Sequence, residues 1–144
     1  MTLKELDNLV KINDLKTEPP DQDEFNSMVN SAKRCLKDAE VDGLSEEGKF
    51  SSAYTAAHLL SLAAMRWHGY RSSNRYQVFQ CLVHTVDFDN VKCRVLGQCH
   101  NLRNVAEYEG HLEITTQLLN ELIEITKELL VLVEALEPVR PSRS

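Results

Sequence analysis

Residues that could perform acid–base or phosphate chemistry gather in one stretch of the chain. They are His100, Arg103, Asn104, Glu107 and His111. If one helix carries them all, a rotation of about 100° per residue projects His100, Asn104 and His111 within roughly 40° of one another. Arg103 and Glu107 then lie beside this stripe. A single helix face would offer two imidazoles, a cation, an amide and a carboxylate.

These side chains include the groups that metal-independent RNA cleavage requires, a cation that binds phosphate and a histidine that transfers protons. An arginine can hold a phosphate with two hydrogen bonds. A histidine that titrates near neutral pH can take a proton from a ribose 2′-hydroxyl or give one to a leaving oxygen. The alternative is a solvated helix face, in which Arg103 and Glu107 form an ion pair between positions i and i+4 that contributes a few tenths of a kcal/mol. Helical periodicity alone leaves both interpretations open.

A second group of cations lies in segment 66–75, which combines three arginines with two aromatic residues in an otherwise acidic chain. Here Arg71 and Arg75 could bind a phosphate or help to stack a base. The alternative is structural: the arginines neutralise the carboxyl end of a helix, and Trp67 packs beneath them.

The other histidines and the cysteines indicate less. His58 lies among alanines and leucines, which favours a histidine of the core or of an interface. The four cysteines include no C-x-x-C pair. Cys93 and Cys99 lie about 120° apart on a helix, too far to share a face with His100 as zinc ligands. We therefore expect neither a metal site nor a cofactor.

The elements that must position these residues are predicted to be helices joined by short loops. Only 5 glycines and 4 prolines occur in 144 residues, most of them where a helix should stop, which argues against an all-β fold. Hydrophobic spacing and capping residues predict helices over residues 3–15, 21–42, 45–68, 74–86, 89–109 and 112–136. We expect an all-α, up-and-down bundle of four to five main helices over 21–137, an N-terminal helical arm over 1–20 and a disordered tail over 138–144.

Two of these helices have a marked composition. The helix over 45–68 is rich in Ala, Leu and Ser. Since small residues let neighbouring helices approach closely, we expect it at the centre of the bundle. The last helix repeats apolar residues in a stripe for packing or for pairing with another copy. The stripe consists of Leu118, Leu119, Leu122, Ile125, Leu129 and Leu132.

Charge and apolar content restrict the partners. The formal net charge is −6, so the overall field does not attract nucleic acid, and any RNA contact must be local. The longest apolar stretch, Leu129–Val133, is far too short for a membrane span, and the first residues do not resemble a secretory leader. We expect a cytoplasmic protein with reduced cysteines and no membrane partner.

Two stretches of the chain resemble the HEPN superfamily, the higher eukaryote and prokaryote nucleotide-binding domains. Residues 53–60, which lead to a glycine exit at 69–71, are similar to the alanine-rich second core helix of that family. Residues 102–108 are similar to its ribonuclease motif, in which an Arg and a polar residue precede a His. The resemblance covers roughly residues 24–136 and implies a HEPN-like helical bundle.

Arg103 and Asn104 match the first two residues of that motif. In HEPN ribonucleases four to six residues separate that Arg from the His. Here seven residues separate Arg103 from His111, and Tyr108 occupies the position after four. The resemblance implies metal-independent RNA cleavage in which His111 moves the proton, Arg103 stabilises the charged transition state and Asn104 positions the phosphate.

The resemblance also implies partners. HEPN protomers commonly face their motif helices across a shared cleft, so a homodimer is expected. Family members often act as ribonuclease toxins beside a nucleotidyltransferase-like antitoxin, which in some cases modifies a tyrosine near the motif. Tyr108 is that candidate, and His100, Glu107, Arg71 and Arg75 are further candidate binding residues. Two alternatives stay open: a non-catalytic HEPN-like module that binds a nucleotide or a partner protein, and a structural helical interaction protein.

Overall fold

The computed structural model describes residues 4–11 and 15–139, and it confirms the all-α fold class. The helices are α1 (Lys4–Lys11), α2 (Gln22–Asp38), α3 (Glu46–Trp67), α4 (Arg75–Gln80), α5 (Leu82–Thr85), α6 (Asn90–Glu109) and α7 (Thr116–Glu134). The strands are β1 (Lys16–Thr17) and β2 (Tyr70–Arg71). In the part of the chain that the structure describes, no helix combines the length and apolarity that a membrane span needs.

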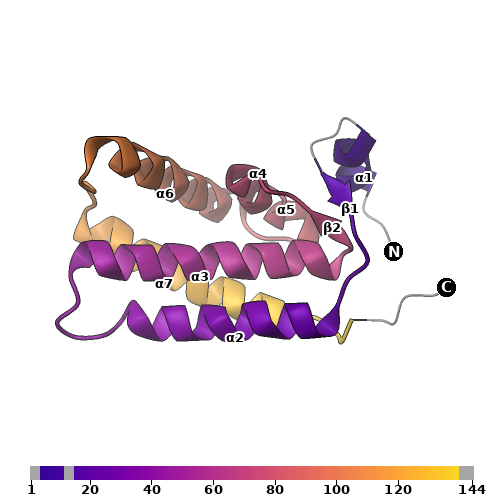
Figure 1. The fold of residues 1–144 in the computed structure, drawn as a ribbon, viewed down its shortest axis with the longest axis horizontal. Helices are drawn as coiled ribbons and strands as arrows, with labels where there is room; N and C mark the ends of the chain where they lie inside the picture. Colours follow the sequence, from indigo (N-terminus) through magenta and orange to yellow (C-terminus); the bar gives the residue numbers. More distant parts are fainter. Residues whose placement is uncertain (1–3, 12–14, 140–144) are drawn as a thin grey trace.

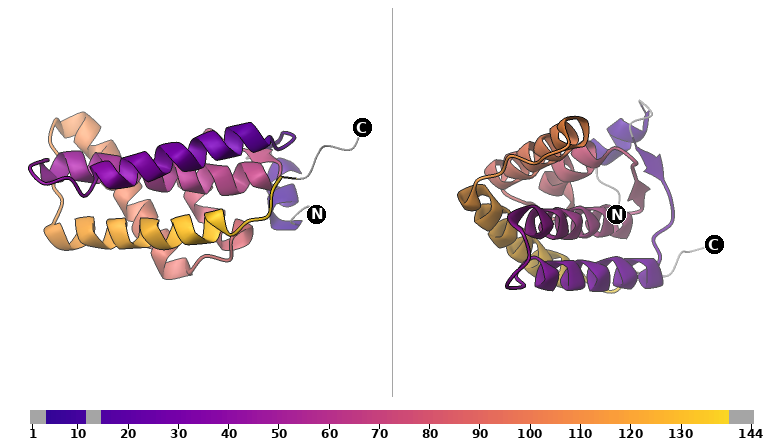
Figure 2. Two further views of the ribbon diagram at one scale, coloured as in Figure 1. Left: turned by 90° about the horizontal axis from the view of Figure 1, so that it is seen from below. Right: turned by 60° about the vertical axis from the view of Figure 1, so that its left-hand side comes forward.

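Successive long helices run in opposite directions, as short loops require. The helices α2 and α3 lie side by side, and α6 lies on the other side of α3 (Figure 1). The short helices α4 and α5 connect the end of α3 to the start of α6. Helix α7 then runs along α3 and α2 and completes the bundle (Figure 2).

Most helices begin at a capping side chain that the sequence displays. Asp21 Oδ1 accepts hydrogen bonds from the backbone N–H groups of Asp23 at 2.8 Å and Glu24 at 3.1 Å. The side chains of Ser45, Asn74 and Asp89 cap α3, α4 and α6 in the same way. These caps satisfy N–H groups that have no partner within the helix, so the predicted starts are confirmed.

Two predicted helices are shorter than expected. α2 ends at Asp38 rather than near residue 42, because the chain leaves it through a turn after its C-cap, Ala39. The helix predicted over 74–86 breaks at Cys81, which caps both α4 and α5 and has a buried side chain. Neither glycine nor proline marks this break, so local composition gave no signal for it.

The last helix also begins later than predicted. Residues 111–115 form no helix, and α7 starts at Thr116 rather than at 112. Thr115 Oγ1 accepts the N–H of Leu118 at 3.0 Å, so this threonine is the N-cap. Leu112, the predicted start of this helix, therefore precedes it.

Helix α3 is buried along most of its length, which confirms its central position. Ala53, Ala57, Leu60 and Ala64 are all completely buried. Alanines at these positions allow the neighbouring helices to approach closely, and a buried leucine contributes about 1.5–3 kcal/mol to stability. The element that carries the first HEPN-like stretch is therefore the centre of the core.

The apolar stripe of α7 serves packing within the chain. Leu122 and Leu129 are completely buried in the same core as α3. Leu132 and Val131 lie at the edge and are exposed. A charge at Leu122 or Leu129 would therefore disturb the fold itself, which removes these two residues from any surface that another copy could contact.

The N-terminal arm packs against the bundle through a second apolar cluster. This cluster consists of Leu6, Leu15, Met65, Tyr70, Val78 and Cys81. The arm is also joined to the bundle by an antiparallel pair of strands, in which Lys16 lies opposite Arg71 and Thr17 opposite Tyr70. At the other end, the Val139 N–H donates to Gln22 Oε1 at 2.6 Å, and residues 140–144 of the predicted tail lie outside the described residues.

A buried arginine connects the arm, α2 and the end of α3. Arg66 is only 2% exposed, and its Nε donates to Glu24 Oε1 at 2.6 Å. Its two terminal nitrogens donate to the backbone carbonyls of Glu18 at 2.9 Å and Pro19 at 2.7 Å. Arg66 Nη2 also lies 3.2 Å from a carboxylate oxygen of Glu18, and Arg71 pairs with both carboxylates, Glu18 at 2.8 Å and Glu24 at 2.6 Å. Burial raises the pKa of Glu24, but the hydrogen bonds from Arg66 and Arg71 outweigh it and hold that pKa below its usual value.

We expect Arg66→Met to lower the free energy of unfolding by about 2–4 kcal/mol, because it removes a buried donor from the backbone carbonyls of Glu18 and Pro19 and one of the two cations that pair with Glu24. Chemical denaturation measures this change. The matched control is Arg34→Met on the exposed face of α2, which should change stability by less than about 0.5 kcal/mol. Equal losses in the two variants would contradict a structural role for Arg66.

Candidate functional site

Helix α6 presents its polar residues toward α3 and α4 and ends just before His111. Gly110 is the C-cap, with φ of 78°, and its N–H donates to the carbonyl of Ala106 at 2.8 Å. This left-handed conformation suits glycine and terminates the helix. His111 therefore lies beyond the helix, so its predicted projection with His100 and Asn104 on one helix face is wrong.

His100 lies at the centre of a polar chain that links α3 to α6. Its Nδ1 is 2.8 Å from the hydroxyl oxygen of Tyr54, a residue with no exposed surface. Its Nε2 is 3.1 Å from the Asn104 amide nitrogen, which donates to it. A neutral imidazole then carries its proton on Nδ1 and donates it to the tyrosine oxygen. Asn104 and Tyr54 together hold the ring of His100 in one orientation.

Two arginines lie over the ring of the same tyrosine. The guanidinium carbon of Arg103 is 5.2 Å from the centroid of the Tyr54 ring, and that of Arg75 is 5.9 Å from it. Such cation–π contacts contribute roughly 0.5–2 kcal/mol each. Arg103 also pairs with Glu107 at 3.4 Å, whereas Arg75 forms no ion pair with any other described residue. The site is thus a local concentration of positive charge in a chain of net charge −6.

Both histidines of the site are held neutral. Burial, followed by the charges of Arg75 and Arg103, lowers the pKa of His58 to about 4. Burial, followed by the charges of Arg103 and Arg75, also lowers the pKa of His100. His58 packs edge-on against Phe79 at 6.1 Å between ring centroids. The two shifts have the same causes because the two imidazoles lie beside the same two guanidiniums.

Tyr76 borders this site at the surface. Its ring is 6.1 Å from that of His100, and 41% of the residue is exposed. It lies against Gly97 of α6, where an added Cβ would be only 3.0 Å from the tyrosine ring. Glycine at 97 therefore lets Tyr76 lie close to α6. We refer to the assembled residues as the Tyr54 cluster: Tyr54, His58, Arg75, Tyr76, Phe79, His100, Arg103 and Asn104.

Arg103 and His111, two of the predicted catalytic residues, line a hollow beside the Tyr54 cluster. It has a volume of about 360 Å³ and lies between the start of α3 and the end of α6. The imidazole of His111 is largely exposed, and its Nε2 is 3.5 Å from a carboxylate oxygen of Glu113. Asn104 does not line this hollow and instead contacts His100. Of the three predicted catalytic residues, Asn104 thus belongs to the Tyr54 cluster, His111 lines the hollow, and Arg103 belongs to both.

The candidate binding residues are also divided. Arg75 and His100 belong to the Tyr54 cluster, and Glu107 borders it through its ion pair. Arg71 instead pairs with the carboxylates of Glu18 and Glu24, so its partners are acidic side chains rather than the carboxyl end of a helix. Tyr108 projects into solvent and is 95% exposed.

Sequence reasoning missed Tyr54 and Tyr76 and interpreted His58 as a histidine of the core. The only local signal was that Tyr54 and His58 are four residues apart, on one face of a helix. Their connection to His100 joins positions 46 residues apart, which periodicity cannot reveal. The described residues contain no group of three or more His, Cys, Asp or Glu side chains that would hold a metal ion.

Comparisons with protein-family models, with curated proteins and with solved structures find no match. The fold and the site by themselves define an all-α bundle with a cationic, histidine-containing cluster between its central helix and α6. The HEPN resemblance stays a prediction.

We expect acid to destabilise the protein partly through His58. The unfolded chain binds a proton at His58 near pH 6.5, whereas the folded chain does so only near pH 4. The free energy of unfolding should therefore fall as pH drops from about 6.5 to 4, by roughly 1–3 kcal/mol from this group. In His58→Phe this decrease of the free energy of unfolding with falling pH should be absent. It should persist in the control His84→Gln, which alters an exposed histidine. Denaturation curves at pH 4.5, 5.5 and 7 measure it; identical slopes in wild type and His58→Phe would contradict it.

Proposed function

We propose that this chain is a HEPN-like helical module that binds the phosphate of a nucleotide, free or within an RNA chain, at the Tyr54 cluster. The observation that carries the proposal is the convergence of Arg75 and Arg103 on one buried ring, 5.9 and 5.2 Å from its centroid. Two planar guanidiniums are suited to bidentate phosphate recognition. Arg75 has no acidic partner among the described residues, so its charge is available to an anion.

The surrounding groups suit a phosphate rather than a metal ion. His100 and Asn104 bring neutral polar atoms beside the two cations, and the carboxylate of Glu107 pairs with Arg103. Burial is the main cause of the lowered pKa values of His58 and His100, and the charges of Arg75 and Arg103 lower them further. An anion bound there would relieve the repulsion between the guanidiniums, so the proposed ligand would stabilise the folded protein.

The HEPN resemblance extends this proposal to partners. Arg103 and Asn104 match the start of the family motif, and both lie on α6. Tyr108 and Val105 of the same helix are exposed, by 95% and 49%. This outward side of α6 is available to a second copy of the chain or to a nucleotidyltransferase-like antitoxin, for which Tyr108 would be the residue modified.

We expect Arg103→Ala and Arg75→Ala each to weaken binding of adenosine 5′-monophosphate roughly tenfold or more, because each removes a charge-assisted contact with phosphate. Titration calorimetry in low salt measures this affinity, which should fall as salt is added. The control is Lys37→Ala, which removes an exposed cation from α2 on the other side of α3. If the folded wild-type protein binds neither this nucleotide nor single-stranded RNA, the proposed function is wrong.

A second candidate function is metal-independent RNA cleavage, and the hollow that Arg103 shares with His111 favours it. In this reaction His111 takes the proton of a ribose 2′-hydroxyl, and the 2′-oxygen forms a bond to phosphorus. The bond from phosphorus to the 5′-oxygen breaks, and the protonated imidazole returns the proton to that oxygen. Arg103 stabilises the additional negative charge on phosphorus. The products are a 2′,3′-cyclic phosphate and a 5′-hydroxyl.

If this chain cleaves RNA, cleavage should persist in excess chelator and should decrease roughly 100-fold or more in His111→Ala, because general acid–base catalysis contributes at least that factor. Gel analysis of single-stranded RNA, with end-group analysis of the products, measures it. Lys37→Ala, which alters an exposed residue of α2 away from both hollows, serves as the control variant. Intact RNA at high concentrations of folded wild-type protein would rule out this candidate and leave phosphate binding unaffected.

A further inference from the structure

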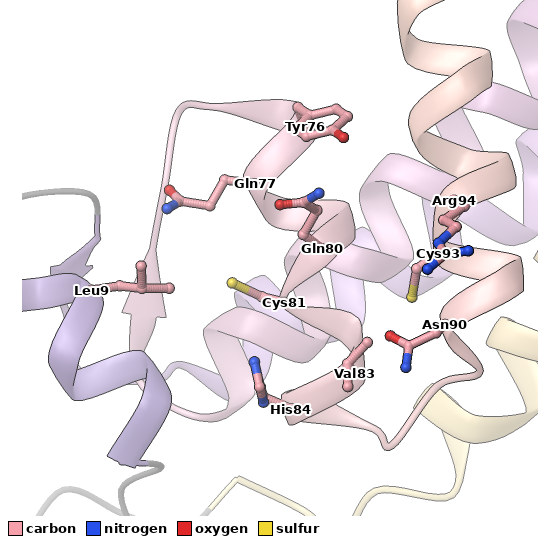
Figure 3. Close-up of a pocket in the computed structure, with 10 residues that line it drawn as sticks. All are labelled: Leu9, Tyr76, Gln77, Gln80, Cys81, Val83, His84, Asn90, Cys93 and Arg94. Carbon is pink, nitrogen blue, oxygen red and sulfur yellow. The ribbon is translucent and has the colours of Figure 1, made fainter.

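A second hollow lies on the other side of Tyr76. It is bordered by α1, α4, α5 and the first turns of α6 (Figure 3) and has a volume of about 430 Å³. Its lining consists of Leu9, Tyr76, Gln77, Gln80, Cys81, Val83, His84, Asn90, Cys93 and Arg94. None of these described residues is acidic, although the chain has a net charge of −6. The hollow is therefore open to an anionic or electron-rich ligand.

Three polar side chains in this hollow make no hydrogen bond or ion pair with the rest of the described structure. Gln80 stands on α4, and Asn90 and Arg94 stand on the facing part of α6 (Figure 3). All three are exposed, and none hydrogen bonds or pairs with another described residue. Each side-chain amide offers a donor and an acceptor side by side, which is the pairing that the edge of a nucleobase requires.

The remaining lining is apolar or uncharged and suits a flat heterocycle. Val83 and Leu9 contribute aliphatic surface. Cys81 and Cys93 are protonated thiols near neutral pH, because burial raises the pKa of each to about 11. A base placed there would contact carbon and sulfur on its faces and amides at its edge.

Tyr76 connects this hollow to the Tyr54 cluster. Its exposed ring lines the hollow, and it lies 6.1 Å from the ring of His100. The neighbouring residue along the chain, Arg75, belongs to the cationic side. Aromatic rings stack on nucleobases of any sequence, and stacking contributes about 1–3 kcal/mol per base. A ligand with an aromatic ring next to a phosphate could place the ring in the hollow on one side of Tyr76 and the phosphate near the cations on the other side.

We propose that this hollow is a nucleobase subsite. The base stacks on Tyr76, the amides of Gln80 and Asn90 bind its edge, and the 5′-phosphate of the same nucleotide lies toward Arg75 and Arg103. Arg94 supplies a further planar cation for the sugar–phosphate side or for stacking. The ligand class is a nucleoside monophosphate unit, either free or within single-stranded RNA. This inference rests on the proposed phosphate site.

Titrations followed by NMR test the subsite, with adenosine 5′-monophosphate and inorganic phosphate as the two probes. The wild-type protein should bind the nucleotide roughly tenfold or more tightly than phosphate, because the base adds stacking and hydrogen bonds. The side-chain amide resonances of Gln80 and Asn90 should shift with the nucleotide only. In the double variant Gln80→Leu/Asn90→Leu, nucleotide affinity should fall toward that of phosphate, while phosphate affinity stays unchanged.

The matched control is Gln117→Leu, which alters an exposed amide on α7 and should change neither affinity. A triadenylate RNA as third probe distinguishes the source of the nucleotide: if it binds more tightly than the monophosphate and loses this advantage in the double variant, the subsite serves RNA. Arg103→Ala should weaken the binding of all three probes.

Two results would overturn the subsite and leave the phosphate site standing. One is equal affinity for nucleotide and phosphate, with both weakened by Arg103→Ala. The other is tighter nucleotide binding that the double variant does not change, since the base would then lie elsewhere. If no probe binds to the folded wild-type protein, the proposed function and the subsite are both wrong.

Discussion

The close packing around α3 is the constraint on which the rest of the structure depends. Its alanines let α2 and α7 approach closely, and this leaves the side of α3 that carries Tyr54 and His58 against α4 and α6. The tyrosine has no exposed surface, so its hydroxyl must find a partner within the protein. His100 supplies that partner. The face of α6 that lies against the core carries the buried residues Cys93, Leu96 and Cys99, and His100, Arg103 and Asn104 lie beside it.

The arginines of the chain divide into two groups with opposite consequences. Arg66 and Arg71 share the carboxylates of Glu18 and Glu24, so their charges are compensated and they hold the arm to the bundle. Arg75 and Arg103 lie instead over the ring of Tyr54, where Arg103 pairs with Glu107 at 3.4 Å and Arg75 pairs with no acidic side chain of the described residues. This difference separates a structural group of cations from one available to a ligand, although Arg71 and Arg75 are only four residues apart.

The three candidate places along α6 form one continuous arrangement. Arg103 belongs both to the Tyr54 cluster and to the hollow that contains His111, and Tyr76 belongs both to the cluster and to the hollow near α1. A ligand longer than a single nucleotide would therefore run along α6 and meet the histidine at one end and the amides at the other. Binding and cleavage place different demands on this path: binding needs the cations, whereas cleavage also needs His111 to leave Glu113 and approach the phosphate.

The sequence by itself determined the all-α class, the starts of α2, α3, α4 and α6 at capping residues and the central place of the alanine-rich helix. These depend on local rules, namely side-chain caps and helical periodicity. It also located His100, Arg103, Asn104 and Arg75 as candidates. Only the tertiary structure decided that Tyr54, His58 and Tyr76 join them, that Arg71 is structural, that α4 and α5 are separate, and that His111 lies beyond α6. The cluster and ion-pair contacts join residues far apart in the chain, and burial of the central helix, rather than any local pattern, brings them together.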